Sequence, residues 1–362
     1  MQQLKRIAGI IIVLLVLAGI AFGSIYSTRW QSLSTLEKLT DYKDGYNLYS
    51  MRVKYDYDLD KVINSGYTDT QGMVEAVVKE ALPLLPVSIK VPAFGCSAFR
   101  TKTVDGRELM GRNYDFKLDT SALMVLCEPK NGYKSLAFAA LNNVNADKAE
   151  TGLASKLACL TAPFICLDGV NEKGVSVAVL TLPSKPTMHN TGKPKLGTPL
   201  LIRLVLDRAA STEEALQLIK QYDILSANGR DYHFVINDAS GNCVAVEFDC
   251  EDKERKLVVT PTPAITNFFI MYSHKVKPSQ ANGIYGKGKE RYNAMLEVLA
   301  RNAGRLDRET AWEALRAASQ APNPADITSN TQWSVVYDNT KGTAEISLRR
   351  RWQDRFAFSI GK

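Results

Sequence analysis

Val91-Pro-Ala-Phe-Gly-Cys-Ser-Ala-Phe-Arg-Thr-Lys-Thr-Val-Asp-Gly-Arg-Glu-Leu-Met-Gly-Arg-Asn-Tyr-Asp-Phe116 is the stretch of this 362-residue chain that carries its clearest local signals. It contains Asp105-Gly106, a strong hairpin signal, because a two-residue type I′ turn needs residues that tolerate positive φ. A turn made by these two residues would place Cys96 opposite Asp115 on the neighbouring strand. Directly opposed residues have Cβ atoms about 4.5–5.5 Å apart. We therefore expect a thiol and a carboxylate to meet at the open end of this hairpin.

Cys96 is a candidate nucleophile. Arg112 lies on the same hairpin, and a nearby guanidinium favours the thiolate, which is the nucleophilic form of cysteine. Gly95 gives an uncrowded backbone directly before the thiol. A free cysteine in an apolar strand is usually a small core residue, which is the structural alternative. The polar residues of Gly-Arg-Asn-Tyr-Asp-Phe, in a strand that otherwise reads as apolar, favour the functional interpretation.

Strict alternation along a strand places Arg112 and Asp115 on opposite faces. A bulge near residues 111–113, or an early end of the strand, would be needed to bring both side chains to the thiol.

The hairpin resembles the choloylglycine hydrolase and acid-ceramidase-like family of N-terminal-nucleophile (Ntn) cysteine amidases. The resemblance rests on Gly95–Ser97, on Arg112 sixteen residues after the cysteine, and on Asp115 three residues further on, and it extends over roughly residues 95–350. It implies an α+β fold, an αββα sandwich of two antiparallel sheets flanked by helices. It also implies self-cleavage between Gly95 and Cys96. The implied enzyme hydrolyses linear, non-peptide amide C–N bonds of small N-acyl substrates and needs no cofactor.

Three later residues complete the site that the resemblance implies. Asn267, in Thr-Asn after a predicted strand, matches the family's Thr-Asn block, whose Asn donates to the oxyanion. Arg291 opens a predicted helix and resembles the family's second active-site Arg. Residues 168–174 resemble the second block, yet Thr181 stands where bile-acid-cleaving members carry an Asn. That departure puts bile-acid specificity in doubt and leaves Thr181 as a candidate substrate or oxyanion contact. A turn Asn and a solvated first-turn Arg are the structural alternatives.

The resemblance implies a catalytic mechanism that needs no histidine. Cys96 would attack, and its own α-amine would accept the proton. The reference pKa of an α-amine is about 7.7–8.0, within a unit of the thiol's roughly 8.5. Asp115 would hold the amine, Arg112 and Arg291 would organise the charge of nucleophile and substrate, and Asn267 would stabilise the oxyanion.

The N-terminus carries a positively flanked apolar run. Lys5-Arg6 precedes residues 7–22, so residues 1–23 are predicted to be a signal peptide or a membrane anchor. The positive flank places the N-terminus in the cytoplasm and the remainder outside. We expect an extracytoplasmic protein that is anchored in the membrane through residues 7–22, or secreted after cleavage near Gly23.

Residues 24–95 form a pre-region. Residues 51–58 alternate between apolar and polar side chains and predict a half-buried strand. Thr68-x-x-Gln71 resembles a capping box before the helical stripe of residues 73–81. The pre-region is interpreted as a pro-segment that covers the nucleophile, or as the first part of the domain, and residues 96–362 as the catalytic domain.

The remaining chain alternates between strand and helix patterns, which fits an α+β sandwich. The patterns predict strands at residues 123–127, 135–141, 164–167, 175–182, 233–237, 243–248, 256–259, 331–337, 343–348 and 356–360, and helices at 198–210, 211–222 and 291–300.

Charge and cysteine content narrow the function classes. The net charge of +7 is spread along the chain, and no basic run interleaved with aromatic residues indicates nucleic acid. The six cysteines permit disulfides outside the cytoplasm, and Cys159–Cys166 is a candidate loop staple. No cysteine or histidine spacing indicates zinc. The oligomeric state is left open.

Two other functions fit these residues. A Cys–His hydrolase would use His189, His233 or His274 as its base, and alanine at each of the three would distinguish it. An envelope protein that keeps the sandwich only for binding is the non-catalytic alternative. Acyl transfer to an amine is also open, as are the substrate's two halves: bile-acid conjugates, penicillin-V-type amides, N-acyl lipids and acyl-amino acids all fit.

Overall fold

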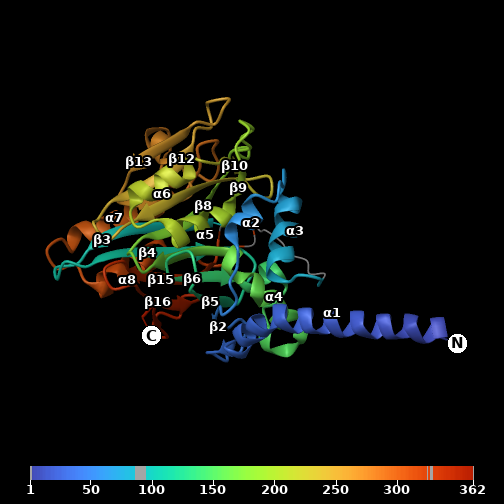
Figure 1. Ribbon diagram of the computed structural model, residues 1–362. Helices are drawn as coiled ribbons and strands as arrows, with labels where there is room; N and C mark the ends of the chain where they lie inside the picture. The colour runs from blue at the N-terminus through green and yellow to red at the C-terminus, as the bar shows by residue number, and fades with distance from the viewer. Residues whose placement is uncertain (1, 86–94, 324, 327–328, 362) are drawn as a thin grey trace.

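The computed structural model describes residues 2–85, 95–323, 325–326 and 329–361. Two β-sheets lie face to face, and helices cover their outer sides (Figure 1). In the described chain the larger sheet has nine strands in the order β1-β2-β5-β6-β7-β8-β11-β12-β13, and the smaller has six in the order β14-β3-β4-β15-β16-β17. The prediction of an αββα sandwich is confirmed.

The larger sheet is antiparallel except where β2 pairs in parallel with β5. Its strands are β1 (Glu37–Lys38), β2 (Leu48–Arg52), β5 (Ala122–Cys127), β6 (Ser135–Ala140), β7 (Cys166–Asn171), β8 (Ser176–Leu182), β11 (Asp231–Asn237), β12 (Cys243–Phe248) and β13 (Leu257–Pro261). A separate short parallel pair joins β9 (Lys195–Gly197) and β10 (Asp223–Leu225).

The smaller sheet is antiparallel throughout. Its strands are β3 (Gly95–Lys102), β4 (Glu108–Asp115), β14 (Ala264–Ile265), β15 (Thr331–Asp338), β16 (Thr343–Leu348) and β17 (Phe356–Ser359).

The helices divide between the two outer faces and the pre-region. They are α1 (Gln2–Ser34), α2 (Leu59–Ile63), α3 (Thr70–Ala81), α4 (Leu153–Ala158), α5 (Thr198–Arg208), α6 (Thr212–Ile219), α7 (Lys289–Arg301) and α8 (Arg308–Ala318), with short 3-10 helices η1 (Leu141–Val144), η2 (Ala149–Thr151), η3 (Cys159–Phe164) and η4 (Ile270–Lys275). Helices α5 and α6 contact the larger sheet, and α7 and α8 contact the smaller one. The sequence analysis had not predicted α8.

The turn between β3 and β4 differs from the predicted one. Gly106 alone in this loop takes a positive φ, +84°, and its N–H donates to the Thr103 carbonyl at 2.9 Å. The Thr103 hydroxyl bonds the Asp105 carboxylate and accepts the Arg107 N–H at 2.9 Å, which stabilises a three-residue loop. The longer loop moves the pairing by one residue.

Cys96 therefore lies opposite Tyr114, and Gly95 lies opposite Asp115. The predicted pairing of Cys96 with Asp115 is wrong by one position. Because a one-residue slip exchanges the two faces of a strand, the Cys96 side chain shares its face with Arg112.

The predicted bulge near residues 111–113 is also wrong. The pairing of β3 with β4 is regular through Asp115, and the irregularity lies in β15, between Thr331 and Trp333. Arg112 and Asp115 stay on opposite faces of β4.

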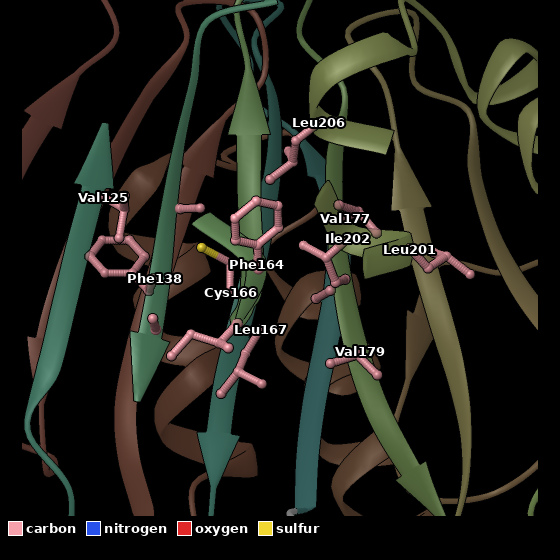
Figure 2. Close-up of a cluster of buried hydrophobic side chains, with 14 of the residues drawn as sticks. Val125, Phe138, Phe164, Cys166, Leu167, Val177, Val179, Leu201, Ile202 and Leu206 are labelled. Atoms are coloured by element: carbon pink, nitrogen blue, oxygen red, sulfur yellow. The ribbon is translucent and has the colours of Figure 1, made fainter. Parts of the chain in front are cut away.

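The core between α5 and the larger sheet is wholly apolar at its centre. Figure 2 shows Leu201, Ile202 and Leu206 of α5 close to Val177 and Val179 of β8, all of them buried. These apolar contacts fix α5 on the sheet.

The pre-region is built into the larger sheet. Side chains of residues 51–58 alternate between buried and exposed, as predicted, but the strand β2 ends at Arg52. The Tyr57 hydroxyl donates to the buried Asp207 carboxylate of α5 at 2.9 Å. The predicted capping box is wrong, because α3 is capped by Asp69, whose carboxylate accepts the Gly72 N–H at 2.8 Å.

Helix α1 extends away from the sheets, with the N-terminus at its far end (Figure 1). Its last turns are docked: the Arg29 guanidinium donates to the carbonyls of Glu80 and Ala81, both at 2.7 Å, at the end of α3. In the part of the chain that the structure describes, no helix has the length and hydropathy needed to cross a bilayer. The signal peptide or anchor at residues 1–23 stays a prediction.

The six cysteines are free, so the predicted Cys159–Cys166 staple is wrong. The Cys159 thiol donates to the Ser155 carbonyl at 3.3 Å, and the Cys166 thiol donates to the Ala162 carbonyl at 3.1 Å.

A chain that starts at Gly95 should fail to fold stably, because it lacks β2 and the buried side chains of the pre-region. Each buried large apolar side chain stabilises a fold by roughly 1.5–3 kcal/mol, while a whole domain has about 5–15 kcal/mol. The control is a chain that starts at Ser24, which keeps the Arg29 contacts. Soluble yield and thermal unfolding measure the difference, and a similar melting temperature for both chains would contradict the expectation.

Candidate active site

The Cys96 thiol lies between the two sheets. Cys96 is the second residue of β3 and fully buried, and Arg112 lies two residue pairs along the hairpin on the same face. Burial raises the pKa of the Cys96 thiol to about 11, and the Arg112 guanidinium and the Asp115 backbone N–H only partly oppose this. At neutral pH the thiol of the intact chain is therefore protonated.

Arg112 ties the two sheets together beside this thiol. Its Nε donates to Asp168 Oδ2 on β7 at 2.8 Å, and its Nη2 donates to the Val179 carbonyl on β8 at 3.0 Å. Its Nη1 donates to the Asn113 carbonyl at 2.9 Å, and the Tyr337 hydroxyl donates to the other oxygen of Asp168. The guanidinium is held from three sides, so its place beside the sulfur is fixed.

Asp168 is a site residue that the sequence analysis missed. It lies in the segment that was interpreted as a hairpin and a family block, but it was given no role. The signal in the sequence was an acidic residue directly after the strand predicted at residues 164–167. The structure buries every residue of β7, and buried carboxylates are almost always paired.

Asn267 holds the backbone of Cys96. Its Oδ1 accepts the Cys96 N–H at 3.1 Å and Nη2 of Arg291 at 2.7 Å, and its Nδ2 donates to the Thr181 carbonyl at 2.9 Å. Arg291 Nη1 donates to the Cys96 carbonyl at 3.1 Å. In β14, Ile265 pairs with Ala98, so the continuing register brings Asn267 level with Cys96.

Asp115 ends β4 opposite Gly95 and is fully buried. Its carboxylate accepts hydrogen bonds from Thr331 Oγ1 at 2.7 Å and Gln320 Nε2 at 2.8 Å, and Arg291 Nη1 lies 3.4 Å away. Burial raises the pKa of the Asp115 carboxyl, and the Arg291 charge and these hydrogen bonds oppose the rise. Gln320 and Thr331 were not predicted, because nothing local marks their contact with β4.

The site thus contacts the side chain of Cys96 from one side and its backbone from another. The thiol of Cys96 faces Arg112 between the sheets, while its backbone nitrogen and carbonyl contact Asn267 and Arg291 at the edge of the smaller sheet. The sequence analysis predicted that Cys96, Arg112, Asp115, Asn267 and Arg291 gather, and the structure brings them together.

Two glycines allow the close approach of this edge. Gly286 and Gly288 have φ values of +110° and +90°, and an added Cβ would lie 2.1 Å from the Asn267 carbonyl and 2.6 Å from Arg291 Nη2, respectively. The Lys287 N–H between them donates to the Asn267 carbonyl at 2.9 Å. The Gly-Lys-Gly turn therefore sets both Asn267 and the first turn of α7.

A cavity of about 820 Å³ opens on this site, with Asn267, Arg291, Thr181 and Gln320 in its wall. The rest of the described wall is largely polar or charged and includes Arg230. The Thr181 hydroxyl lies 3.4 Å from the Asp231 carbonyl.

In the described structure, two of the three histidines are hydrogen-bonded away from Cys96, and the third is exposed. His189 Nε2 lies 2.9 Å from the Arg255 carbonyl, His233 is bonded to Glu247 and to the Thr266 carbonyl, and His274 is exposed. Within the described residues, no hydrogen bond joins a histidine to Cys96. The Cys–His alternative has no geometric support here.

Comparisons with known proteins agree with this geometry. The family of linear amide C–N hydrolases, choloylglycine hydrolase family, matches residues 96–263. The match begins at the predicted nucleophile and includes Arg112 and Asp115. No curated protein matches the chain in sequence.

Solved structures share the fold. A variant of conjugated bile acid hydrolase from Clostridium perfringens has a TM-score of 0.55 at 17% identity, over 74% of this chain and 93% of that chain. Penicillin V acylase from Agrobacterium tumefaciens has a TM-score of 0.54 at 16% identity, over 74% of this chain and 87% of that one.

These matches replace the non-catalytic alternative with a hydrolase that acts on linear amide bonds. Residues 96–263 thus match the choloylglycine hydrolase family of linear amide C–N hydrolases from Cys96 onward, and the αββα fold is shared with the solved structures.

Proposed function

We propose that this protein cleaves itself between Gly95 and Cys96 and then hydrolyses the amide bond of a small N-acyl substrate with Cys96 as nucleophile. The observation that carries the proposal is the setting of the Cys96 backbone nitrogen. It bonds Asn267 Oδ1 at 3.1 Å, and Asp115 lies opposite the residue before it. A free amine at this position would have an acceptor and a carboxylate at hand.

Self-cleavage would begin with attack of Cys96 Sγ on the Gly95 carbonyl carbon. The C–N bond breaks, the nitrogen takes a proton, and a thioester joins Gly95 to the sulfur. Water then opens the thioester, which leaves a Gly95 carboxylate, a free thiol and the α-amine of Cys96. Gly95 suits this step because a glycine tolerates a strained backbone without a Cβ clash.

Substrate hydrolysis would repeat the attack on a second carbonyl. The α-amine of Cys96 takes the thiol proton and returns it to the leaving amine, so the base is part of the nucleophilic residue. Asp115 and Asn267 hold this amine. Asn267 uses one Nδ2 proton for the Thr181 carbonyl, which leaves one for the oxyanion, worth on the order of 2.7–4 kcal/mol per donor.

The pre-region would stay bound after the cut. Strand β2 remains paired with β5, Tyr57 remains bonded to Asp207, and Arg29 remains bonded to the end of α3. These contacts support a mature enzyme of two chains.

The substrate is proposed to carry a hydrophobic acyl group on a non-peptide amide, and the family match of residues 96–263 and the predicted membrane location support this. The described cavity wall exposes polar and apolar surface in nearly equal parts, which suits a molecule with a polar amine half and an apolar acyl half. Bile-acid conjugates, penicillin-V-type amides and N-acyl lipids remain the candidate classes, with acyl transfer to an amine as the second reaction.

A panel of N-acyl amides and short peptides tests the function. The wild-type protein should hydrolyse one or more N-acyl amides in preference to peptides. Cys96→Ser should lower or abolish that activity, and Cys96→Ala should abolish it, because the alanine variant has no nucleophile. Preference for peptides, or turnover by the alanine variant near the wild-type rate, would refute the proposal.

Self-cleavage should accelerate with pH. A thiol pKa raised to about 11 means that the protonated form dominates below it, so the thiolate fraction grows about tenfold per pH unit between pH 7 and 10. Chain refolded at each pH, followed by denaturing electrophoresis and N-terminal sequencing, should yield a fragment that begins Cys96-Ser97-Ala98. Cys96→Ala should stay whole at every pH. An active wild type that remains uncut would overturn this part of the proposal.

Asp115→Asn and Arg112→Lys should both fold and lose activity by roughly 10²-fold or more. The first removes the charged partner of the amine, and the second replaces a guanidinium fixed from three sides by a point charge. The matched controls are Asp207→Asn and Arg203→Lys, which alter another buried ion pair, at 2.7 Å, away from the site. The control variants should lose stability but keep kcat. Equal kcat losses in both sets would assign all four residues to the fold alone.

A further inference from the structure

A buried histidine–glutamate pair lies next to the Asn267 segment and is not used by the mechanism. His233 on β11 and Glu247 on β12 are both fully buried, and His233 Nδ1 lies 3.0 Å from Glu247 Oε1. His233 Nε2 lies 2.9 Å from the Thr266 carbonyl. The ring therefore bridges the Glu247 carboxyl group on β12 and the Thr266 carbonyl beside Asn267.

Glu247 makes further contacts with its carboxylate. Oε1 accepts the Ile270 N–H at 2.7 Å, and Oε2 accepts the Met271 N–H at 2.9 Å. These two residues begin η4, where the first N–H groups have no partner within the helix. With His233 as third partner, the Glu247 side chain is held by three hydrogen bonds.

The pair thus holds the chain on both sides of Asn267. His233 fixes the carbonyl of Thr266, directly before Asn267, and Glu247 fixes the N–H groups of Ile270 and Met271, a few residues after it. Without these bonds, two buried backbone groups, the Thr266 carbonyl and the Ile270 N–H, would be left unpaired at a cost of about 1–3 kcal/mol each, and the partly buried Met271 N–H would lose its partner as well. The segment between them therefore has one well-defined path.

Asn267 in turn positions the nucleophile. Its Oδ1 accepts the Cys96 N–H, and its carbonyl accepts the Lys287 N–H at 2.9 Å. The Thr266 hydroxyl donates to the Gly288 carbonyl at 2.9 Å, which connects the same segment to the start of α7 and to Arg291. A displacement of Thr266 would therefore move the groups that hold both ends of the Cys96 backbone.

We propose that His233 and Glu247 are positioning residues that hold Asn267 in register with Cys96. The proposal rests on the role given to Asn267 above. Well-packed apolar residues often stabilise a fold as much as a buried polar pair does, or more. Here the pair instead supplies directed donors and acceptors that an apolar cluster cannot supply.

The variants His233→Gln and Glu247→Gln test the pair. A glutamine presents both of its donors from one nitrogen and cannot reach two acceptors on opposite sides of a ring, and Glu247→Gln removes an acceptor while it keeps the shape. Because a misplacement of about 1 Å can cost roughly 10²-fold in rate, each variant should lower kcat by about 10- to 100-fold, with KM within about twofold. Self-cleavage after Gly95 should slow as well. Rates are expressed per folded chain, from the native fraction in thermal unfolding.

His189→Gln is the matched control. The His189 ring is also bonded at both nitrogens, to the Arg255 carbonyl at 2.9 Å and to the Ile224 N–H at 3.2 Å, but these partners lie outside the site. This variant should keep kcat and KM. Loss of stability without loss of kcat in His233→Gln or Glu247→Gln would overturn the proposal and leave the pair a purely structural one.

A double-mutant cycle with Asn267→Ala separates this inference from the proposed function. Asn267→Ala alone should lose activity, and adding His233→Gln to it should cost less than about threefold more, since the residue to be positioned is gone. Effects that multiply in full would overturn the inference while the role of Asn267 stands. An Asn267→Ala protein with wild-type kcat would overturn both. If His233→Gln does not fold, Glu247→Gln completes the same cycle.

Discussion

The buried ion pair between Arg112 and Asp168 is the contact on which the rest of the structure depends. It crosses from the smaller sheet to the larger one at 2.8 Å, and both side chains are fully buried. The same guanidinium lies beside the Cys96 thiol, so the relative position of the two sheets and the environment of the nucleophile are determined together. Truncating either partner would leave an uncompensated charge inside the sandwich, which costs far more than the pair itself contributes.

Much of the fold could be predicted because the central strands are short apolar runs, buried along their whole length, and the helices between them carry apolar stripes. Strand β12 has the predicted bounds, and α5 lies within the helix predicted at residues 198–210. The register of the first hairpin could not be predicted from its Asp-Gly dipeptide alone. The Thr103 side chain stabilises a three-residue loop, and that longer loop shifts the pairing by one position. A short signal of this kind identifies a hairpin, but side-chain hydrogen bonds decide its register.

The sequence also revealed only some of the residues of the site. Cys96 and Asp115 were recognisable because they stand close in sequence within one hairpin. Asp168, Gln320 and the His233–Glu247 pair were not, since each reaches the site only through contacts between distant segments. In physical terms, the sequence marks the groups that react, while the groups that hold them are determined by packing and by the need to pair every buried polar atom.

The docking of the pre-region makes the unfolding of the uncut protein different from that of the cut protein. Before the cut, β2 and β5 belong to one molecule, and unfolding is a unimolecular and reversible event. After a cut at Gly95, the same strands belong to two molecules, and recovery of the native state requires a bimolecular encounter at whatever concentration the protein has. The uncut chain can refold by itself, whereas the cut protein stays native only while its two chains remain associated. Its lifetime would therefore be governed by the rate of chain dissociation rather than by a folding equilibrium.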